Sequence, residues 1–211
     1  GLAYAKDRKQ FGKAIIEFPA VYDMLAIMKG KLDAGRALLY QTARYVDIYK
    51  ALDDISRERK LTPEERLEQK KYAKLADSFT PLAKGMNSEY ANQNADDCIQ
   101  IHGGSGFMME YACQRIYRDA RITSIYEGTT QLQTVAAIRY VTNGSYLATI
   151  REFETVPCSP EMEPLMSRLK KMADQFEAST NAVKEAQDQE LLDFTARRLM
   201  EMAADIIMCH L

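Results

Sequence analysis

One carboxylate in the chain, Glu127, stands where a turn meets the start of a helix. Gly128 follows it and permits close backbone approach, and Thr129 and Thr130 next along suit a helix N-terminus. Apolar residues at three-to-four spacing over 132–138 predict a helix directly behind this loop. The pattern presents a carboxylate on the rim of a loop held by a rigid element, as a general base is held. The plainer interpretation is a solvated carboxylate favoured by the helix dipole.

Composition excludes several classes of protein. The chain has 211 residues, 46% of them hydrophobic, and its 28 basic and 30 acidic side chains leave a net charge of -2. A nucleic-acid-binding protein normally carries a basic excess. No apolar run approaches the ~20 residues of a membrane span, and no signal peptide is recognisable. The chain begins without an initiator methionine, so we expect a fragment of a longer protein.

Cysteine and histidine are too scattered to predict a metal site. The four cysteines form no Cys-x-x-Cys pair, and only two histidines are present. Structural zinc needs such ligands at short spacing, so we expect no metal and interpret the cysteines as free thiols in an intracellular compartment.

The apolar spacing predicts an all-α chain, an up-and-down helical bundle followed by further helices, with no convincing strand. A first long helix is expected from Pro19 to about residue 50, and Gly30 and Gly35 within it suggest close helix–helix approach. Residues 51–61 are charged and appear irregular in this pattern. A second long helix, expected from 63 to 102, is interrupted by a proline.

Sequence signals mark the ends of the second helix and its interruption. Thr62 and Glu65, with Pro63 between them, form a capping box at its start. Pro81 is expected to kink or break the helix near Phe79. Paired glycines stop the pattern after His102.

The rest of the chain predicts shorter helices and a division into two parts. Helices are expected over 110–121 and from about 130 to 140, and two more are marked by apolar residues between 165 and 206. A proline-rich stretch, 151–164, is interpreted as a linker. We therefore predict a domain over 1–150 and an additional helical extension over 151–211. The last helix is still amphipathic at Leu211, so the extension is expected to be truncated.

Three stretches of the sequence stand out together. They are residues 4–12 (YAKDRKQFG), 100–107 (QIHGGSGF), and 118–121 (RDAR) running on to 125–129 (IYEGT). A Gly-Gly turn alone is common, but the three stretches in this order and at this separation resemble the C-terminal helical domain of the acyl-CoA dehydrogenase family of flavoproteins. The resemblance covers residues 1–145.

The resemblance implies a reaction for Glu127. In this family the corresponding carboxylate removes the α-proton of an acyl-CoA thioester while a β-hydride passes to FAD, and Gly128 would lie at the substrate. A carbon acid of this kind requires a desolvated base, for which Ile125 and Tyr126 are expected to supply an apolar wall. Neighbouring backbone amides are expected to stabilise the thioester oxygen.

The resemblance also implies a set of FAD-binding residues. They are Arg8, Gln10, Phe11, Gln100, Gly103, Gly104, Thr129 and Gln131. Arg8 suits the pyrophosphate, and the turn at 100–104 meets the dinucleotide of a neighbouring subunit in the family. Plainer interpretations are a surface arginine, a core phenylalanine, a glycine helix stop and a helix cap. His102 is interpreted as a packing or turn residue.

Other family features extend beyond this chain. The N-terminal helical domain and middle β-domain of the family are absent, so domains missing from the chain would complete the FAD site, and the fragment alone is expected to be inactive. The resemblance implies an acyl-CoA substrate, an electron-transferring flavoprotein as acceptor, and a homodimer or homotetramer, without nucleic acid or a membrane span. The insert over 53–69 and the extension resemble a longer bacterial subgroup, which implies a cytoplasmic enzyme.

Two alternatives stay open at this point. One is an acyl-CoA oxidase-type relative, in which oxygen reoxidises the flavin. The other is a non-catalytic helical homologue used for assembly or nucleic-acid binding. The net charge of -2 and the presence of Glu127 argue against the second alternative.

Overall fold

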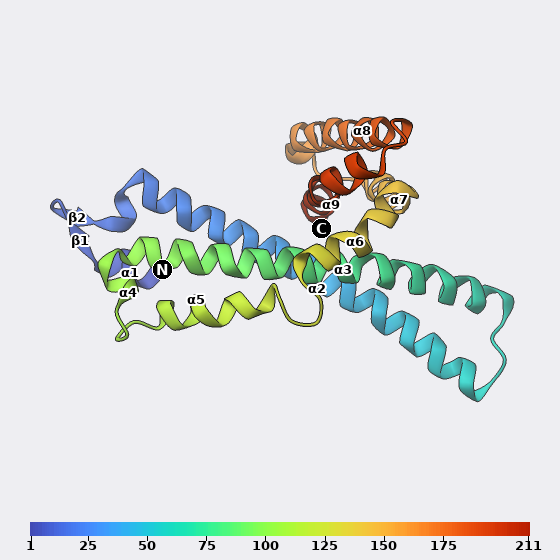
Figure 1. Ribbon diagram of the computed structural model, residues 1–211, viewed down its shortest axis with the longest axis horizontal. Helices are drawn as coiled ribbons and strands as arrows, with labels where there is room; N and C mark the ends of the chain where they lie inside the picture. The colour runs from blue at the N-terminus through green and yellow to red at the C-terminus, as the bar shows by residue number, and fades with distance from the viewer. The chain divides into compact units, whose positions relative to one another are not determined.

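The computed structural model describes residues 1–211 and contains nine α-helices (Figure 1). The helices are α1 Leu2–Asp7, α2 Pro19–Glu58, α3 Pro63–His102, α4 Gly104–Phe107, α5 Ala112–Thr123, α6 Thr130–Thr142, α7 Ser145–Phe153, α8 Glu163–Glu185 and α9 Gln189–His210. Two short 3₁₀ helices, η1 Ile15–Glu17 and η2 Pro160–Met162, complete the helical elements. The predicted all-α class is confirmed. The expectation of no strand was wrong at one place, a minimal hairpin of β1 Lys9–Gln10 and β2 Lys13–Ala14.

The chain forms two compact units. One comprises residues 1–35 and 85–130, and the other comprises 36–84 and 131–211. Both α2 and α3 contribute residues to each unit, so the division passes through the long helices. The predicted domain boundary near residue 150 stays a prediction.

The helix α2 continues to Glu58, so the expectation that residues 51–61 are irregular was wrong for 51–58. Arg57 accounts for part of this regularity, because its Nη2 donates to Asp53 Oδ2 at 2.7 Å, one helical turn away. Its Nη1 also reaches Asp54 Oδ1 at 3.2 Å. Charged residues at this spacing support an exposed helix.

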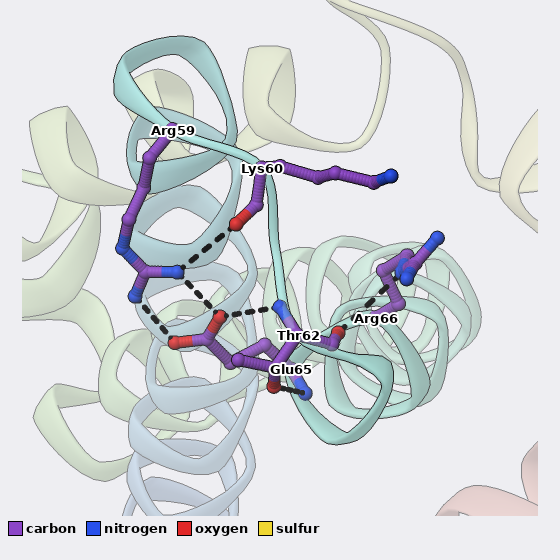
Figure 2. A network of polar contacts seen from close by, with 5 residues as sticks. All are labelled: Arg59, Lys60, Thr62, Glu65 and Arg66. Atoms are coloured by element: carbon purple, nitrogen blue, oxygen red, sulfur yellow. Dashed lines mark hydrogen bonds and ion pairs between the residues drawn. The ribbon is translucent and has the colours of Figure 1, made fainter.

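The predicted capping box at the start of α3 is confirmed. Glu65 N donates to Thr62 Oγ1 at 3.2 Å, and Thr62 N donates to Glu65 Oε2 at 2.9 Å. Arg59, the residue that directly follows α2, donates to the same carboxylate from both terminal guanidinium nitrogens. Nη1 lies 2.8 Å from Oε2 and Nη2 lies 2.6 Å from Oε1 (Figure 2). The four-residue connection between α2 and α3 is therefore fixed by one carboxylate.

Pro81 does not break α3, which is continuous from Pro63 to His102, so of the predicted kink or break the break is wrong. A proline inside a helix removes one backbone hydrogen bond and costs ~3 kcal/mol. Here Pro81 lies between Phe79 and Leu82, both of which are fully buried. Tyr146 of α7 also donates its hydroxyl to Ser78 O at 2.6 Å, in the turn before the proline. Tertiary packing offsets the local cost.

The two C-terminal helices predicted from the apolar spacing are confirmed as α8 and α9, which pack against each other. Their mutual core consists of fully or nearly fully buried side chains: Ala173, Phe176, Leu199, Ala203, Ala204 and Ile207. Arg151 of α7 joins this pair through Asp174 and Glu177 of α8, at 2.7 and 2.9 Å. All four cysteines are free thiols. None of the helices combines the length and apolar character of a membrane span.

The first unit holds together the motifs at residues 4–12 and 100–107. Ala5, Ile15 and Ile101 form a small buried core that joins α1, η1 and the end of α3. Partly buried residues of 16–28 pack against it. This core brings the hairpin and the end of α3 together, although about ninety residues of sequence separate them.

Candidate functional site

A cavity of about 560 Å³ opens between the hairpin and the end of α3. Six of the residues predicted to bind a cofactor line it: Arg8, Gln10, Phe11, Gln100, Gly103 and Gly104. The other lining residues are Tyr4, Ile15, Phe18, Val21, Ile101, His102 and Ser105. Its volume falls in the range of small-molecule sites. Two motifs far apart in sequence therefore line one cavity.

The side-chain charge that lines the cavity is positive. Arg8 carries the only full positive charge among the thirteen lining residues, and none of them is acidic. The Arg8 side chain is exposed and forms no ion pair with a carboxylate of this chain. An exposed guanidinium in a cavity without carboxylates suits an anionic group, phosphate or pyrophosphate above all.

The hairpin presents Phe11 at its tip. Phe11 and Gly12 both have positive φ, 48° and 83°, as the central residues of a two-residue type I′ hairpin require. Glycine tolerates this conformation, whereas a bulky side chain in it is strained. The Phe11 ring is nonetheless 88% exposed, with one edge-on contact to Phe18 at 6.3 Å. Of the two sequence interpretations, core packing is therefore wrong for Phe11.

The glycine turn lines the cavity at the end of α3. Helix α3 ends at His102, and Gly103 has a φ of 58° that favours glycine. Gly104 has no such requirement, and a β-carbon on it would meet nothing of this chain within 4 Å. A glycine at this position is explained neither by backbone conformation nor by packing within the chain. Its absent side chain leaves room at the cavity wall.

His102 packs as predicted and also lines the cavity. Its ring stacks on Tyr4 at 4.1 Å and meets Tyr111 edge-on at 5.6 Å. Its Nδ1 lies 2.7 Å from Cys98 O, one turn back along α3. Tyr4 and Ser105 also line the cavity and were not among the predicted site residues. Tyr4 lies within the first motif, so its place there was the available signal.

Glu127 lies in a separate loop of the same unit. It has a φ of 53°, and Gly128 after it has a φ of 98°. Glu127 is exposed, and so are Ile125 and Tyr126, at 45% and 52%. The expected apolar wall is therefore not formed by these side chains within the chain itself. Two consecutive residues with positive φ therefore stand just before the start of α6.

The remaining predicted residues lie beside Glu127 and outside the cavity. Thr129 directly precedes α6, and Gln131 is an exposed residue of its first turn. Neither of them lines the cavity, and neither do Glu127 and Gly128. The predicted residues therefore lie in two places: one group lines the cavity, and the other occupies residues 127–131.

Comparison with known families defines the class of protein. Residues 2–141 match the family described as "Acyl-CoA dehydrogenase, C-terminal domain", and residues 142–211 match "Acyl-CoA dehydrogenase C terminal". The chain belongs to the acyl-CoA dehydrogenase family. The resemblance seen in the three sequence motifs is confirmed.

Two curated relatives are similar over about two thirds of the chain. The caffeyl-CoA reductase-Etf complex subunit CarC of Acetobacterium woodii is 38% identical over 132 residues, which are 63% of this chain and 28% of that protein. The (2S)-methylsuccinyl-CoA dehydrogenase of Cereibacter sphaeroides is 35% identical over 139 residues, 66% of this chain and 21% of that protein. The chain thus corresponds to less than a third of either relative.

A solved structure is similar over almost the whole chain. It is the acyl-CoA dehydrogenase complexed with FAD from Bacillus anthracis, with a TM-score of 0.67 and 27% sequence identity. The match covers 99% of this chain and 35% of that one. The similarity to this structure therefore includes the C-terminal helices.

Proposed function

We propose that the chain is the C-terminal part of an FAD-dependent enzyme that removes hydrogen from the α and β carbons of an acyl-CoA thioester. The single observation that carries the proposal is the cavity of the first unit, in which Arg8, Phe11 and the glycine turn at 103–104 meet. Family membership supports the same reaction class.

The cavity fits one part of a dinucleotide. Arg8 offers an exposed cation for a pyrophosphate, and Gln10 and Gln100 offer amide groups. Phe11 offers an aromatic surface at the price of backbone strain, and Gly104 leaves space that a side chain would fill. Thr129 and Gln131, beside Glu127, would contact FAD nearer its flavin end, with the rest of the site completed by other domains.

Glu127 is proposed as the base. Its carboxylate would take the α-proton, and the C–H electron pair would form the new α,β double bond as hydride leaves the β carbon. FAD, when bound, would supply the acceptor for that hydride. The exposed carboxylate needs an apolar enclosure to become an effective base, and parts of the enzyme beyond this chain would provide it. Backbone N–H groups near Gly128 would face the thioester oxygen.

A reductase is the second candidate, because the relative with 38% identity is a subunit of a caffeyl-CoA reductase-Etf complex. The same residues would then act in reverse, with protonated Glu127 delivering the α-proton. An electron-transferring flavoprotein is the proposed redox partner in either direction. An enzyme of the oxidase type would instead be reoxidised by oxygen. Stopped-flow reoxidation of the reduced flavin by electron-transferring flavoprotein and by oxygen separates an enzyme that uses the flavoprotein from one of the oxidase type.

The base assignment is tested in the full-length enzyme with Glu127→Gln. We expect kcat to fall by at least 10²–10⁴-fold, because removal of a general base costs about that much. Glu110→Gln is the matched control, since Glu110 is also an exposed loop carboxylate of the first unit. Activity of Glu127→Gln equal to that of the control would refute the assignment.

The cofactor assignment is tested by FAD affinity. Arg8→Gln should weaken FAD binding by roughly 10–100-fold, since a hydrogen bond to a charged group contributes ~1.5–3 kcal/mol. Arg115→Gln, another exposed arginine of the same unit, should leave the affinity unchanged. Fluorescence titration of the apo full-length enzymes measures both dissociation constants. Equal affinities in the two variants would contradict the proposed contact.

A further inference from the structure

Helix α3 holds both ends of the loop that carries Glu127. Two polar side chains of α3, Glu89 and Asn92, are three residues apart and therefore lie on the same helical face. Glu89 contacts the first residue of α6, and Asn92 contacts the last turn of α5. These two helices are the ones that the loop connects.

The contact with α6 is a hydrogen bond between Thr130 and Glu89. Thr130 Oγ1 donates to Glu89 Oε1 at 2.6 Å, a length typical of a hydroxyl bound to an ionised carboxylate. Thr130 is 8% exposed and Glu89 is partly exposed, so the bond is partly shielded from water. Thr130 N also donates to Ser124 O at 3.1 Å, which closes the loop at its base.

The contact with α5 holds the other end. Asn92 Nδ2 donates to Ala120 O at 3.1 Å and to Ser88 O at 2.7 Å. Arg121 Nη1 donates to Ser124 Oγ at 3.2 Å. Residues 124 and 130 are thus fixed, with five residues between them. Of these five, Ile125 and Tyr126 continue the last turn of α5, because both backbone amides donate to Ile122 O, at 2.9 and 3.0 Å.

Within those five residues the backbone of Glu127 is strained. A residue with a side chain costs roughly 1–2 kcal/mol in the left-handed region. Such a conformation persists only where the surroundings enforce it. Asn92 holds the α5 end of the loop. At the α6 end the side-chain bond from Thr130 to Glu89 acts together with the backbone bond from Thr130 N to Ser124 O.

We propose that Glu89 is a positioning residue for Glu127, acting through Thr130; the inference rests on the proposed role of Glu127 as the base. Loss of the bond would let the loop relax from its strained conformation and move the carboxylate from the α-carbon. A displacement of about 1 Å can lower a rate by ~10²-fold. Substrate binding would change little, because the loop carries one reacting group and not the bulk of the acyl-CoA site.

The test compares Thr130→Val with Thr130→Ser in the full-length enzyme. Valine has the shape of threonine without the hydroxyl, and serine keeps the donor. We expect Thr130→Val to lower kcat by roughly 10–100-fold with KM within about threefold of wild type, and Thr130→Ser to keep kcat within about threefold. Thr142→Val is the matched control at the far end of α6, where the hydroxyl bonds only to carbonyls of its own helix.

Amide hydrogen exchange of residues 124–130 supplies a readout independent of turnover. Exchange should be faster in Thr130→Val than in wild type and should return to the wild-type rate in Thr130→Ser. If Thr130→Val fails to fold, Glu89→Gln takes its place. A neutral amide is a weaker acceptor than the carboxylate, so kcat should fall about three- to tenfold at constant KM.

Each outcome decides the inference. Equal kcat in Thr130→Val and Thr142→Val would overturn it, and so would equal losses in the valine and serine variants. Glu127→Gln in the same series tests the role of Glu127 as the base separately from the positioning role of Glu89. If Glu127→Gln loses activity while Thr130→Val does not, the base stands and the positioning role of Glu89 is wrong. If Glu127→Gln is fully active, the proposed base itself is wrong.

Discussion

The backbone of Gly35 in α2 lies directly against the side-chain amide of Asn87 in α3, and a β-carbon on Gly35 would overlap with Asn87 Oδ1. Gly30, little more than one turn earlier in the same helix, would meet nothing within 4 Å if it carried a β-carbon. A side chain at position 35 therefore requires Asn87 to shift, whereas one at position 30 displaces nothing of this chain.

These two glycines form a matched pair of substitutions. Gly30→Ala should raise the free energy of unfolding by about 0.5–1 kcal/mol, because alanine has the higher helix propensity. Gly35→Ala gains the same propensity but must displace Asn87, and overpacking costs ~1–3 kcal/mol, so the net effect should be destabilising. Urea unfolding measures both. A stabilising Gly35→Ala would show that Asn87 moves aside freely.

The glycine pair illustrates what sequence could and could not predict about the fold. Helical spacing predicted that both glycines lie in one helix and that the chain is all-α. Local residue signals predicted the capping box of Thr62 and the end of the helix after His102. Helical spacing could not tell Gly35 from Gly30, because close approach depends on which face of α2 meets α3. Pro81 was misjudged for a similar reason, since its local cost is offset by the burial of residues distant in sequence.

The same limit applies to the candidate site. Sequence motifs named Arg8 and Gln100 separately, and the structure adds that they line one cavity through the small core of Ala5, Ile15 and Ile101. Glu127 was predicted on a loop rim, where it lies. The contact that closes its loop was not predicted, because Glu89 and Thr130 are 41 residues apart and no local pattern links them.

Replacement of Phe11 is predicted to have opposite effects on stability and on cofactor binding. Phe11→Asn places the Asn-Gly pair favoured by type I′ turns at positions 11 and 12, which should relieve about 1 kcal/mol of strain. The same change removes an exposed aromatic surface from the cavity, so FAD should bind more weakly. Urea unfolding and fluorescence titration of the full-length protein measure the two effects. Unchanged FAD affinity would mean that the exposed ring has another use.

The Arg59–Glu65 contact predicts a pH-dependent contribution to stability. The hydrogen bonds from Arg59 and from the backbone of Thr62 lower the pKa of the Glu65 carboxyl to about 2. A carboxyl with a lowered pKa stabilises the folded state above its unfolded pKa, near 4.3 for glutamate, and this contribution is lost as the pH falls toward about 2. Glu65→Gln should therefore be less stable than wild type at pH 6.

The difference between Glu65→Gln and wild type should shrink as the pH is lowered from 5 toward 3. Thermal unfolding midpoints of both proteins across this range measure it, and NMR titration of the Glu65 carboxyl gives its pKa directly. Glu68→Gln is the control, because Glu68 is exposed on the same helix and lies outside the network drawn in Figure 2. A pH-independent difference would place the stabilising effect of Glu65 elsewhere than in its charge.

The hydroxyl of Tyr146 is predicted to support the turn of α3 that precedes Pro81. The side chain is fully buried, its hydroxyl donates to Ser78 O at 2.6 Å, and burial raises the pKa of the phenol. Tyr146→Phe leaves the ring packing intact but deprives a buried carbonyl of one partner. Stability should fall by about 1–2 kcal/mol.

Tyr40→Phe is the control for this change, because Tyr40 is 70% exposed on α2 and should shift stability by less than ~0.5 kcal/mol. If the two variants are equally stable, the Tyr146 hydroxyl does not support the turn, and apolar packing around Phe79 and Leu82 alone holds α3 through the proline. If Tyr146→Phe is selectively destabilised, amide exchange in the turn containing Ser78 should also be faster. That pattern would locate the compensation for Pro81 in one hydrogen bond from α7.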